Sequence, residues 1–509
     1  MAKRVFHPEY GSGEVVTYRR GGRVAIVDFE SRPMPTHVPV REFAIREVDE
    51  KEDETDRSGV DDLLATGPRF EGSRDETESS RVLEAMRLGV VPSSSIDVYT
   101  VGRDVEVGQV QADLGRADRG DGAVRAFLGD YGTGKTHLLQ LAQNRALENN
   151  FLAAHVVLDP RETPPSHPKR VYRDLVHSLQ YPDRRHDEDT GLEPLFDQAV
   201  ADDEVREQFD VRRGKGDRDK RLAEDGMHLY LSPALSYYRE LAADDVRDRV
   251  EDVDDLDRYL DDAETLLFDW IEGHPTISNT DLNDHLSHIE GAYPWLYSLM
   301  DYRPWARIYG YMLSGLSTLA RAVGYSGLAV FVDEAERFSL LSAENREFAR
   351  YVFKALSFAA VGDAGVPFDR AQLDDLGGWG IQKELPPRYG EATGMYAVFA
   401  MTPHEEGIES LHQAIPPGKV SELGRFDDRD YAELAAKVCD FYASAYPDWE
   451  MTERTVTRCT SLVEDCRSRG HIANPRDAMK FLVEFLDIAR RRPDEVGDVV
   501  RQLEHLTMA

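Results

Sequence analysis

The chain has 509 residues, too many for a single hydrophobic core of ordinary size, so we expect two to four domains. Its 41% of hydrophobic residues can build packed cores, and 95 acidic against 61 basic residues give a formal charge of -34. Because the acids are spread along the whole chain, this charge favours a halophilic, solvated surface and argues against DNA binding by the surface as a whole. The net negative charge is still compatible with a local basic site that binds DNA.

The first residues, Met1–Phe6, lack the apolar stretch of a signal peptide, and no apolar run approaches the roughly 18 residues of a membrane span. We therefore expect a cytoplasmic protein without a membrane partner. Three cysteines, Cys439, Cys459 and Cys466, have no Cys or His at metal-ligand spacing. They are predicted to be buried thiols, since no disulfide framework is implied.

Residues 1–47 are predicted to form a small β-barrel. Short β-rich segments, Val15–Val16, Val24–Val27 and His37–Val40, are separated by glycine turns. Residues 48–78 are acidic and poor in apolar residues, which indicates a flexible linker.

From Arg81 onward, helical patterns alternate with short apolar runs. The runs are Val124–Leu128, Ala153–Leu158, Leu328–Val332 and Tyr396–Met401. Runs of this length between turn or polar residues suit strands that are buried on both faces of a parallel sheet. The pattern predicts an α/β fold with a doubly wound parallel sheet.

Helical spacing also dominates two regions outside the sheet. Residues at about 170–325 are rich in Asp, Arg, Leu and Tyr and are predicted to form a long helical insertion. The region after 425 is helical again. We therefore assign a core to 79–425 and a C-terminal helical lid to 426–509.

Eight residues after the first apolar run match the G-x-x-x-x-G-K-[ST] pattern at every fixed position. They are Gly129, Asp130, Tyr131, Gly132, Thr133, Gly134, Lys135 and Thr136. Such a loop curls so that its backbone N–H groups, with the helix N-terminus that follows, face the phosphates of a nucleotide. Lys135 would contact the phosphates and the Thr136 hydroxyl would bind Mg²⁺, so the expected cofactors are ATP and Mg²⁺.

A second motif follows Leu328–Val332, where the strand ends in Asp333 and Glu334. One carboxylate at this position lies beside the metal, and the other polarises an attacking water. We expect Asp333 to hold Mg²⁺ through water and Glu334 to be the catalytic base. The two motifs together predict a Mg²⁺-dependent ATPase, a P-loop NTPase of the AAA+ type.

Further positions fit an AAA+ site. Thr402 follows Tyr396–Met401 and would serve as sensor 1 near the γ-phosphate, or it is an ordinary strand-end residue. Arg476 opens a C-terminal helix and would reach the phosphates as sensor 2, or it is a solvated first-turn arginine. Gly102 and Arg103 resemble a Gly-Arg-x-x-Glu box that leads into many AAA+ modules, where it contributes to the adenine pocket.

The segment Leu83–Pro92 resembles the EALRxGVP opening of BREX-system ATP-binding proteins of the BrxD type. In that family a P-loop follows, and then a Glu-Thr-Pro segment ahead of a helix, which here is Glu162–Val171. The resemblance covers roughly 80–490. It implies an antiviral ATPase encoded with phage-exclusion systems, which acts on or near DNA together with other defence-system proteins.

Val5–Val16 resembles the HPxFGxGxV opening of Tudor-like modules in CarD-type proteins and at the ends of some DNA helicases. In those settings the barrel contacts a protein partner, often RNA polymerase, or nucleic acid. Basic residues outnumber acidic ones within 1–47, which hints at DNA or an acidic partner. A spacer barrel without a ligand is the alternative.

The leading interpretation is an ATP-hydrolysing motor or switch that couples nucleotide state to assembly on DNA or partner proteins. One alternative is a regulator tethered to RNA polymerase, in which ATP only locks a conformation. Another is an origin-recognition-like loader, which should carry a winged-helix domain after the lid. An AAA+ site usually takes an arginine finger from a neighbouring subunit, so a homo-oligomer is considered. The candidate fingers are Arg337, Arg388 and Arg425.

Overall fold

The computed structural model of the chain contains two compact units, Met1–Asp61 and Asp62–Ala509. Before residue 72 the structure describes the backbone of four strands, and beyond it most of residues 72–497. Within that range the residues outside the description are 73, 92–94, 185–189, 210–226, 244, 251–252, 254, 275–276, 287, 289–295 and 375–384.

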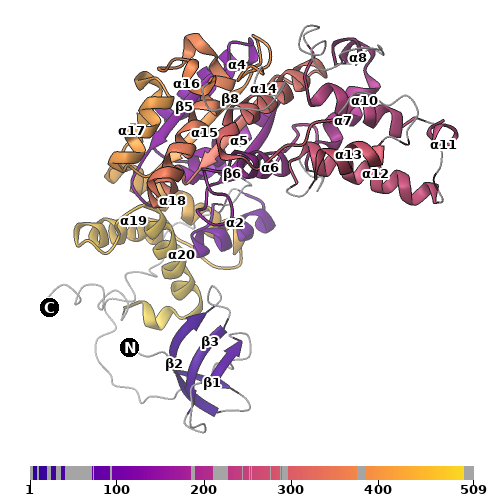
Figure 1. Cartoon of the computed structure of the whole chain (residues 1–509). Helices are drawn as coiled ribbons and strands as arrows, with labels where there is room; N and C mark the ends of the chain where they lie inside the picture. Colours follow the sequence, from indigo (N-terminus) through magenta and orange to yellow (C-terminus); the bar gives the residue numbers. More distant parts are fainter. Residues whose placement is uncertain are drawn as a thin grey trace. The chain divides into compact units, whose positions relative to one another are not determined.

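The N-terminal unit contains an antiparallel sheet in the order β1-β2-β3-β4. Figure 1 labels the first three of these strands. Its strands are β1 (Arg4–His7), β2 (Gly11–Arg19), β3 (Val24–Phe29) and β4 (Thr36–Pro39). The last three overlap the predicted β-rich segments, whereas β1 was not among them. The side chains of this unit and the predicted linker as far as residue 71 lie outside the described residues. The Tudor-like barrel therefore stays a prediction.

The larger unit is built on a parallel five-stranded sheet in the order β6-β7-β8-β5-β9. Its strands are β5 (Ala123–Leu128), β6 (Phe151–Val157), β7 (Gly327–Asp333), β8 (Tyr396–Met401) and β9 (Val420–Glu422). The first four confirm the predicted strands and the α/β class; β9 was missed because it is short and only partly buried. Because β8 lies between β5 and β7, the residue after β8 falls between the P-loop and the Asp-Glu pair.

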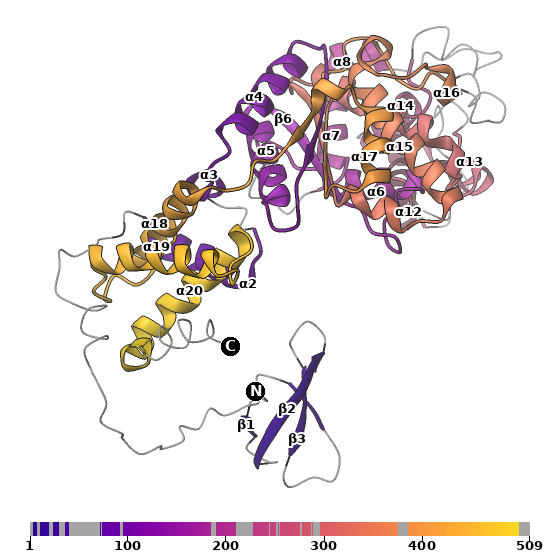
Figure 2. The same ribbon diagram turned by 90° about the vertical axis from the view of Figure 1, so that its left-hand side faces the viewer.

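Both faces of this sheet are buried, as the apolar runs predicted. In β7, Leu328, Val330 and Val332 belong to one hydrophobic cluster, whereas Ala329 and Phe331 belong to another. Two helices cover one face, α4 (Asp104–Asp118) and α5 (Lys135–Glu148) (Figure 2). The other face carries α6 (Pro168–His177), α14 (Ala306–Ala322), α15 (Ala343–Val361) and α17 (Glu405–Ala414).

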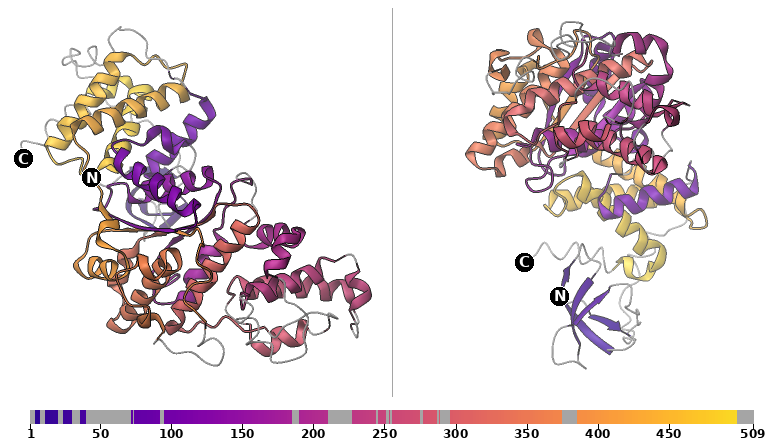
Figure 3. Two further views of the ribbon diagram at one scale, coloured as in Figure 1. Left: turned by 90° about the horizontal axis from the view of Figure 1, so that it is seen from above. Right: turned by 45° about the vertical axis from the view of Figure 1, so that its right-hand side comes forward.

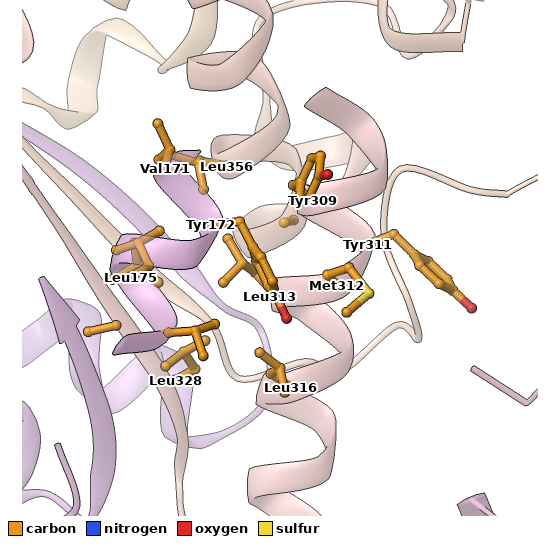
Figure 4. Close-up of a cluster of buried hydrophobic side chains, with 14 of the residues drawn as sticks. Val171, Tyr172, Leu175, Tyr309, Tyr311, Met312, Leu313, Leu316, Leu328 and Leu356 are labelled. Atoms are coloured by element: carbon orange, nitrogen blue, oxygen red, sulfur yellow. The ribbon is translucent and has the colours of Figure 1, made fainter. Parts of the chain in front are cut away.

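A helical insertion separates β6 from β7 (Figure 1). Its outer helices are α7 (Glu193–Ala201), α8 (Asp203–Phe209), α10 (Leu231–Leu241), α11 (Val246–Arg249), α12 (Leu256–Ile271) and α13 (Asn279–Leu286). The insertion is anchored where α6 packs on α14, with the Tyr172 and Tyr309 rings 5.4 Å apart (Figure 4). Lys169 of α6 is buried there and donates to the backbone carbonyl of His274 at 2.8 Å, and its burial lowers its pKa to about 8.

His228 joins the insertion to α14. Its Nδ1 accepts the backbone N–H of Leu231 at 3.0 Å, so Nε2 carries the proton and donates to the Tyr311 carbonyl at 3.3 Å. The imidazole also stacks on the Tyr311 ring, with centroids 4.1 Å apart. Burial lowers the pKa of His228 to about 3, so the native ring is neutral.

We expect His228 to make the folded protein less stable as pH falls. Its folded pKa lies below the unfolded value of about 6.5, so its contribution is complete above pH 6.5 and is lost between about pH 6.5 and 3. In urea unfolding below pH 6, wild type should lose about 1.4 kcal/mol per pH unit more than His228→Asn. Equal slopes for the two proteins would show that the ring is not held neutral.

Three C-terminal helices and one helix from before the P-loop pack together, and this four-helix group is called the lid below (Figure 3). They are α18 (Asp428–Ala445), α19 (Glu453–Ser468), α20 (Pro475–Arg491) and α2 (Glu76–Leu88). Arg87 of α2 pairs with Asp487 of α20 at 2.6 Å, and Arg74 pairs with Asp440 of α18 at 2.7 Å. The helix that opens the predicted core therefore belongs to the lid, and it begins inside the range predicted as linker.

The remaining elements are short. They are α3 (Ile96–Tyr99), η3 (Arg303–Trp305), η4 (Ala335–Leu340), η5 (Asp363–Gly365), α16 (Ala371–Asp374), η7 (Pro417–Lys419) and η8 (Pro493–Glu495). Cys439, Cys459 and Cys466 are buried and free, as predicted. Among the helices in the described ranges, none has the length and apolar character that a membrane crossing requires.

Candidate nucleotide-binding site

The loop predicted to bind phosphate, Gly129–Thr136, joins β5 to α5. Gly132 and Gly134 have left-handed backbone angles, with φ of 81° and 94°, which would strain a residue with a side chain. A Cβ at Gly132 would also lie 2.4 Å from the side chain of Asn474, the N-cap of α20. Glycine therefore allows the loop to curl over the N-terminus of α5 and allows the lid to touch it.

Lys135 is buried beneath this loop. Its ammonium donates to the Gly129 carbonyl at 2.9 Å, to the Asp130 carbonyl at 3.3 Å and to the Thr402 hydroxyl at 2.9 Å. These acceptors account for all three N–H bonds of the ammonium. Since phosphate oxygens are stronger acceptors than neutral carbonyls, the ammonium can exchange these partners for a nucleotide.

Thr136 and Asp333 meet at the carboxyl end of β7. The Thr136 hydroxyl donates to Asp333 Oδ2 at 2.8 Å, and Asp333 Oδ1 accepts the Glu334 N–H at 2.8 Å. In the described part of the chain, no three His, Cys, Asp or Glu side chains are grouped to hold a metal by themselves. One hydroxyl and one carboxylate suit Mg²⁺, which keeps several waters and takes phosphate oxygens as further ligands.

Glu334 has a left-handed backbone, with φ of 56°, which is uncommon for a residue with a side chain. The carboxylate pairs with Arg337 at 3.1 Å, and the residue lines the pocket above the P-loop. A strained backbone of this kind costs about 1–3 kcal/mol and is typical of functional sites. The strain is a second reason, independent of the motif, to assign Glu334 a chemical role.

The pocket is partly open to solvent, and the empty space within and at its mouth is about 870 Å³. Its floor is Tyr131–His137, which is most of the P-loop and the start of α5, and its walls come from the α2–α4 segment and from the lid. The apolar wall residues are Met86, Val90, Val91, Tyr99, Val101, Phe426, Leu434 and Met479. A cationic end at Lys135 and an apolar end between the walls match the two halves of a nucleotide. Sequence analysis assigned none of these residues to the site. Met86, Val90 and Val91 lie in the segment Leu83–Pro92, which showed only a family resemblance, and the other five were given no role.

Arg103 is predicted to contribute to the adenine pocket, and it does line the cavity. Its guanidinium is nevertheless engaged elsewhere, with donations to the Thr133 carbonyl at 2.7 Å and the Gly424 carbonyl at 2.9 Å. Arg103 therefore ties the P-loop to the segment that enters the lid. Gly102 is not among the lining residues; a Cβ there would lie 2.7 Å from the Asp430 carboxylate, so it serves close packing against α18.

His137 lies next to Thr136 and also faces the pocket. Its Nε2 is 2.7 Å from the Thr100 hydroxyl, and its ring meets the Tyr99 ring edge-on at 4.9 Å. Burial, and then the positive charges of Arg103 and Lys437, lower the pKa of His137 to about 4. A neutral ring therefore lies beside the predicted phosphate-binding loop at physiological pH.

Arg476, predicted as sensor 2, lies at the N-terminus of α20 and lines the pocket. It donates to the Tyr131 hydroxyl at 2.9 Å and lies over the Tyr131 ring at 5.2 Å. Tyr131 itself is 70% exposed, so this contact closes over the outer side of the P-loop. Thr402, predicted as sensor 1, lies between the P-loop and η4, where it also donates to Glu336, a residue that no sequence pattern singled out.

The three candidate arginine fingers lie in different places. Arg337 is paired with Glu334, and Arg425 is 86% exposed and pairs with Asp130 of the P-loop at 2.9 Å. Arg388 donates to the carbonyl of Glu391 and to the Thr393 hydroxyl, just before β8. Arg388 therefore lies near the amino ends of the parallel strands, whereas the P-loop of the same chain lies at their carboxyl ends.

Residues 75–280 match the model of the family described as BREX system ATP-binding protein BrxC/D. The matched stretch begins beside α2, contains the P-loop and ends within the helical insertion, before Asp333. None of the curated proteins matches the chain. Over the stretch that carries the predicted phosphate-binding loop, the chain is thus similar to BREX-system ATP-binding proteins, a family whose name implies that ATP is bound.

Proposed function

We propose that this chain is a Mg²⁺-dependent ATPase of a BREX-like antiviral defence system. The observation that carries the proposal is the convergence of Lys135, the Thr136–Asp333 pair and Glu334 at one end of a single pocket. Each supplies a different requirement of phosphoryl transfer, namely a cation for the phosphates, a metal site and a base for the attacking water.

In the proposed reaction, Lys135 leaves the loop carbonyls and contacts the β- and γ-phosphates. Thr136 and Asp333 would hold Mg²⁺, Thr136 through its hydroxyl and Asp333 through water, and the bound metal would neutralise negative charge on the phosphates. Glu334 accepts a proton from the water that attacks the γ-phosphorus, and ADP leaves with the bridging oxygen. Arg476 is proposed to respond to the phosphates directly as a sensor, and Thr402 through its hydrogen bond with Lys135.

The proposed work of the nucleotide is to lock or move the lid. Contacts already join the lid side to the P-loop: Asn474 lies against Gly132, and Arg476 donates to Tyr131. A nucleotide in the pocket would touch both sides, so its affinity would differ between open and closed arrangements of the lid. This difference is the means by which nucleotide state would control assembly with other BREX components.

ATP hydrolysis measured at high salt, with and without DNA, tests this proposal, together with particle size in ATP, in ADP and without nucleotide. We expect hydrolysis that is lost when Mg²⁺ is chelated, and a larger particle with ATP if a neighbouring subunit supplies an arginine finger. ATP binding without any turnover would instead favour a regulator in which the nucleotide only locks a conformation.

Deletion of residues 1–47 is expected to leave hydrolysis without DNA nearly unchanged and to weaken attachment to DNA or to a protein partner. The reason is the basic balance of this segment in an otherwise acidic chain, ahead of an acidic stretch. A linker of about 30 residues reaches on the order of 30 Å, so the segment would act as a tether that raises local concentration. DNA shifts and pull-downs across a salt series measure the attachment to DNA or to a protein partner. Loss of ATP hydrolysis without DNA in the truncated protein would contradict the tether role.

A further inference from the structure

A carboxylate that no motif predicted lies beside the phosphate-binding lysine. Glu336 belongs to η4, directly after β7, and its Oε1 accepts the hydroxyl proton of Thr402, which directly follows β8. Thr402 in turn accepts a hydrogen bond from Lys135 Nζ at 2.9 Å. Lys135, Thr402 and Glu336 therefore form one chain of hydrogen bonds across the ends of β5, β8 and β7.

The chemistry of the three groups fixes the direction of this chain. An ammonium only donates, an ionised carboxylate only accepts, and a hydroxyl has a single proton to give. Thr402 must therefore give its proton to Glu336 and present a lone pair to Lys135. While this arrangement holds, Thr402 has no proton left to donate to a γ-phosphate.

The second oxygen of Glu336, Oε2, is buried, and among the described residues it has no hydrogen-bond partner. Buried carboxylate oxygens are normally satisfied, because leaving one bare costs free energy. Arg337, the next residue along the chain, is engaged with another acid, Glu334. Burying the carboxylate of Glu336 with one unpaired oxygen therefore costs folding free energy. Its other oxygen is linked to Lys135 through the Thr402 hydroxyl.

We infer that Glu336 is a positioning residue for ATP hydrolysis, which fixes the Thr402 hydroxyl as an acceptor and so holds the Lys135 ammonium in line with the γ-phosphate. The inference rests on the proposed ATPase function. Glu336 does not line the nucleotide pocket, whereas Glu334 does, so the two acids have different tasks. Glu334 faces the reacting water and Glu336 acts through Thr402.

A double-mutant cycle tests this inference. Glu336→Gln is placed in three backgrounds: wild type, Thr402→Ser, which keeps the hydroxyl, and Thr402→Val, which removes it with little change of shape. We expect Glu336→Gln to lower kcat by about 10–100-fold in the two backgrounds with a hydroxyl, with KM for ATP changed by less than about threefold. In the Thr402→Val background it should add no further loss. Glu344→Gln, an exposed acid of α15, is the matched control and should leave kcat unchanged.

A loss of the same size with and without the hydroxyl would overturn the inference, because Glu336 would then not act through Thr402. An unchanged kcat in Glu336→Gln would overturn it as well. A wild-type protein without turnover would defeat the proposed ATPase function instead. In that case the free energy of unfolding of the same variants in urea decides between the outcomes. A change caused by Glu336→Gln that requires the hydroxyl at position 402 supports the coupling of Glu336 to Thr402. Additive changes in the free energy of unfolding overturn it.

Discussion

Glu334→Gln is expected to keep ATP bound while lowering turnover by about 10²–10⁴-fold, the usual cost of losing a general base. The amide has nearly the shape of the carboxylate and can still hydrogen-bond a water, but it cannot take the proton. It leaves the Thr136–Asp333 pair and Lys135 unchanged, so affinity for Mg²⁺-ATP should stay within a few-fold. Steady-state hydrolysis and calorimetric binding of ATP measure the two effects.

Two controls separate chemistry from strain at this position. Glu347→Gln removes an exposed acid from α15 and should leave turnover unchanged. Glu334→Gly removes the base and also relieves the left-handed backbone, so it should lower turnover yet raise stability by about 1 kcal/mol. Undiminished hydrolysis in Glu334→Gln would move the base elsewhere in the site.

The parts of the site that the sequence predicts are those that are continuous along the chain. A phosphate cradle is one loop between a strand and a helix, so Gly129–Thr136 carries its own signal, including glycines where the backbone is left-handed. Asp333 and Glu334 are likewise recognisable because a fully buried strand ends immediately before Glu334. Four of the five parallel strands were visible for the same reason: burial on both faces leaves a continuous apolar run.

The parts that escaped prediction depend on which strands are neighbours. Glu336 and Thr402 are 66 positions apart and meet only because β8 is next to β7. Arg103 reaches Gly424, 321 positions away, through the placement of β9 beside β5. Neither strand order nor the pairing of α2 with the C-terminal helices leaves a periodic trace in the sequence, because each segment shows only that it has a buried face.

Lys135→Met is expected to weaken binding of Mg²⁺-ATP by at least about 100-fold. Methionine retains the apolar stem of the buried side chain but removes the charge, which would make charge-assisted hydrogen bonds to two phosphates, each worth about 1.5–3 kcal/mol. The Gly129 and Asp130 carbonyls and the Thr402 hydroxyl would also lose their donor. Titration calorimetry with Mg²⁺-ATP, under conditions where wild type binds, measures the change.

Lys354→Met is the matched control for this substitution. Lys354 and Lys135 are equally buried, at 8% exposure each, and both donate to neutral oxygen atoms, in the case of Lys354 to Gln372 Oε1 at 2.7 Å. The two variants therefore lose a comparable buried cation, but only Lys135 lines the pocket. A similar fall in ATP affinity in both would point to general destabilisation. If Lys135→Met binds Mg²⁺-ATP as tightly as wild type, the nucleotide binds outside the P-loop. If Lys135→Met alone loses affinity, Lys135 contacts the phosphates.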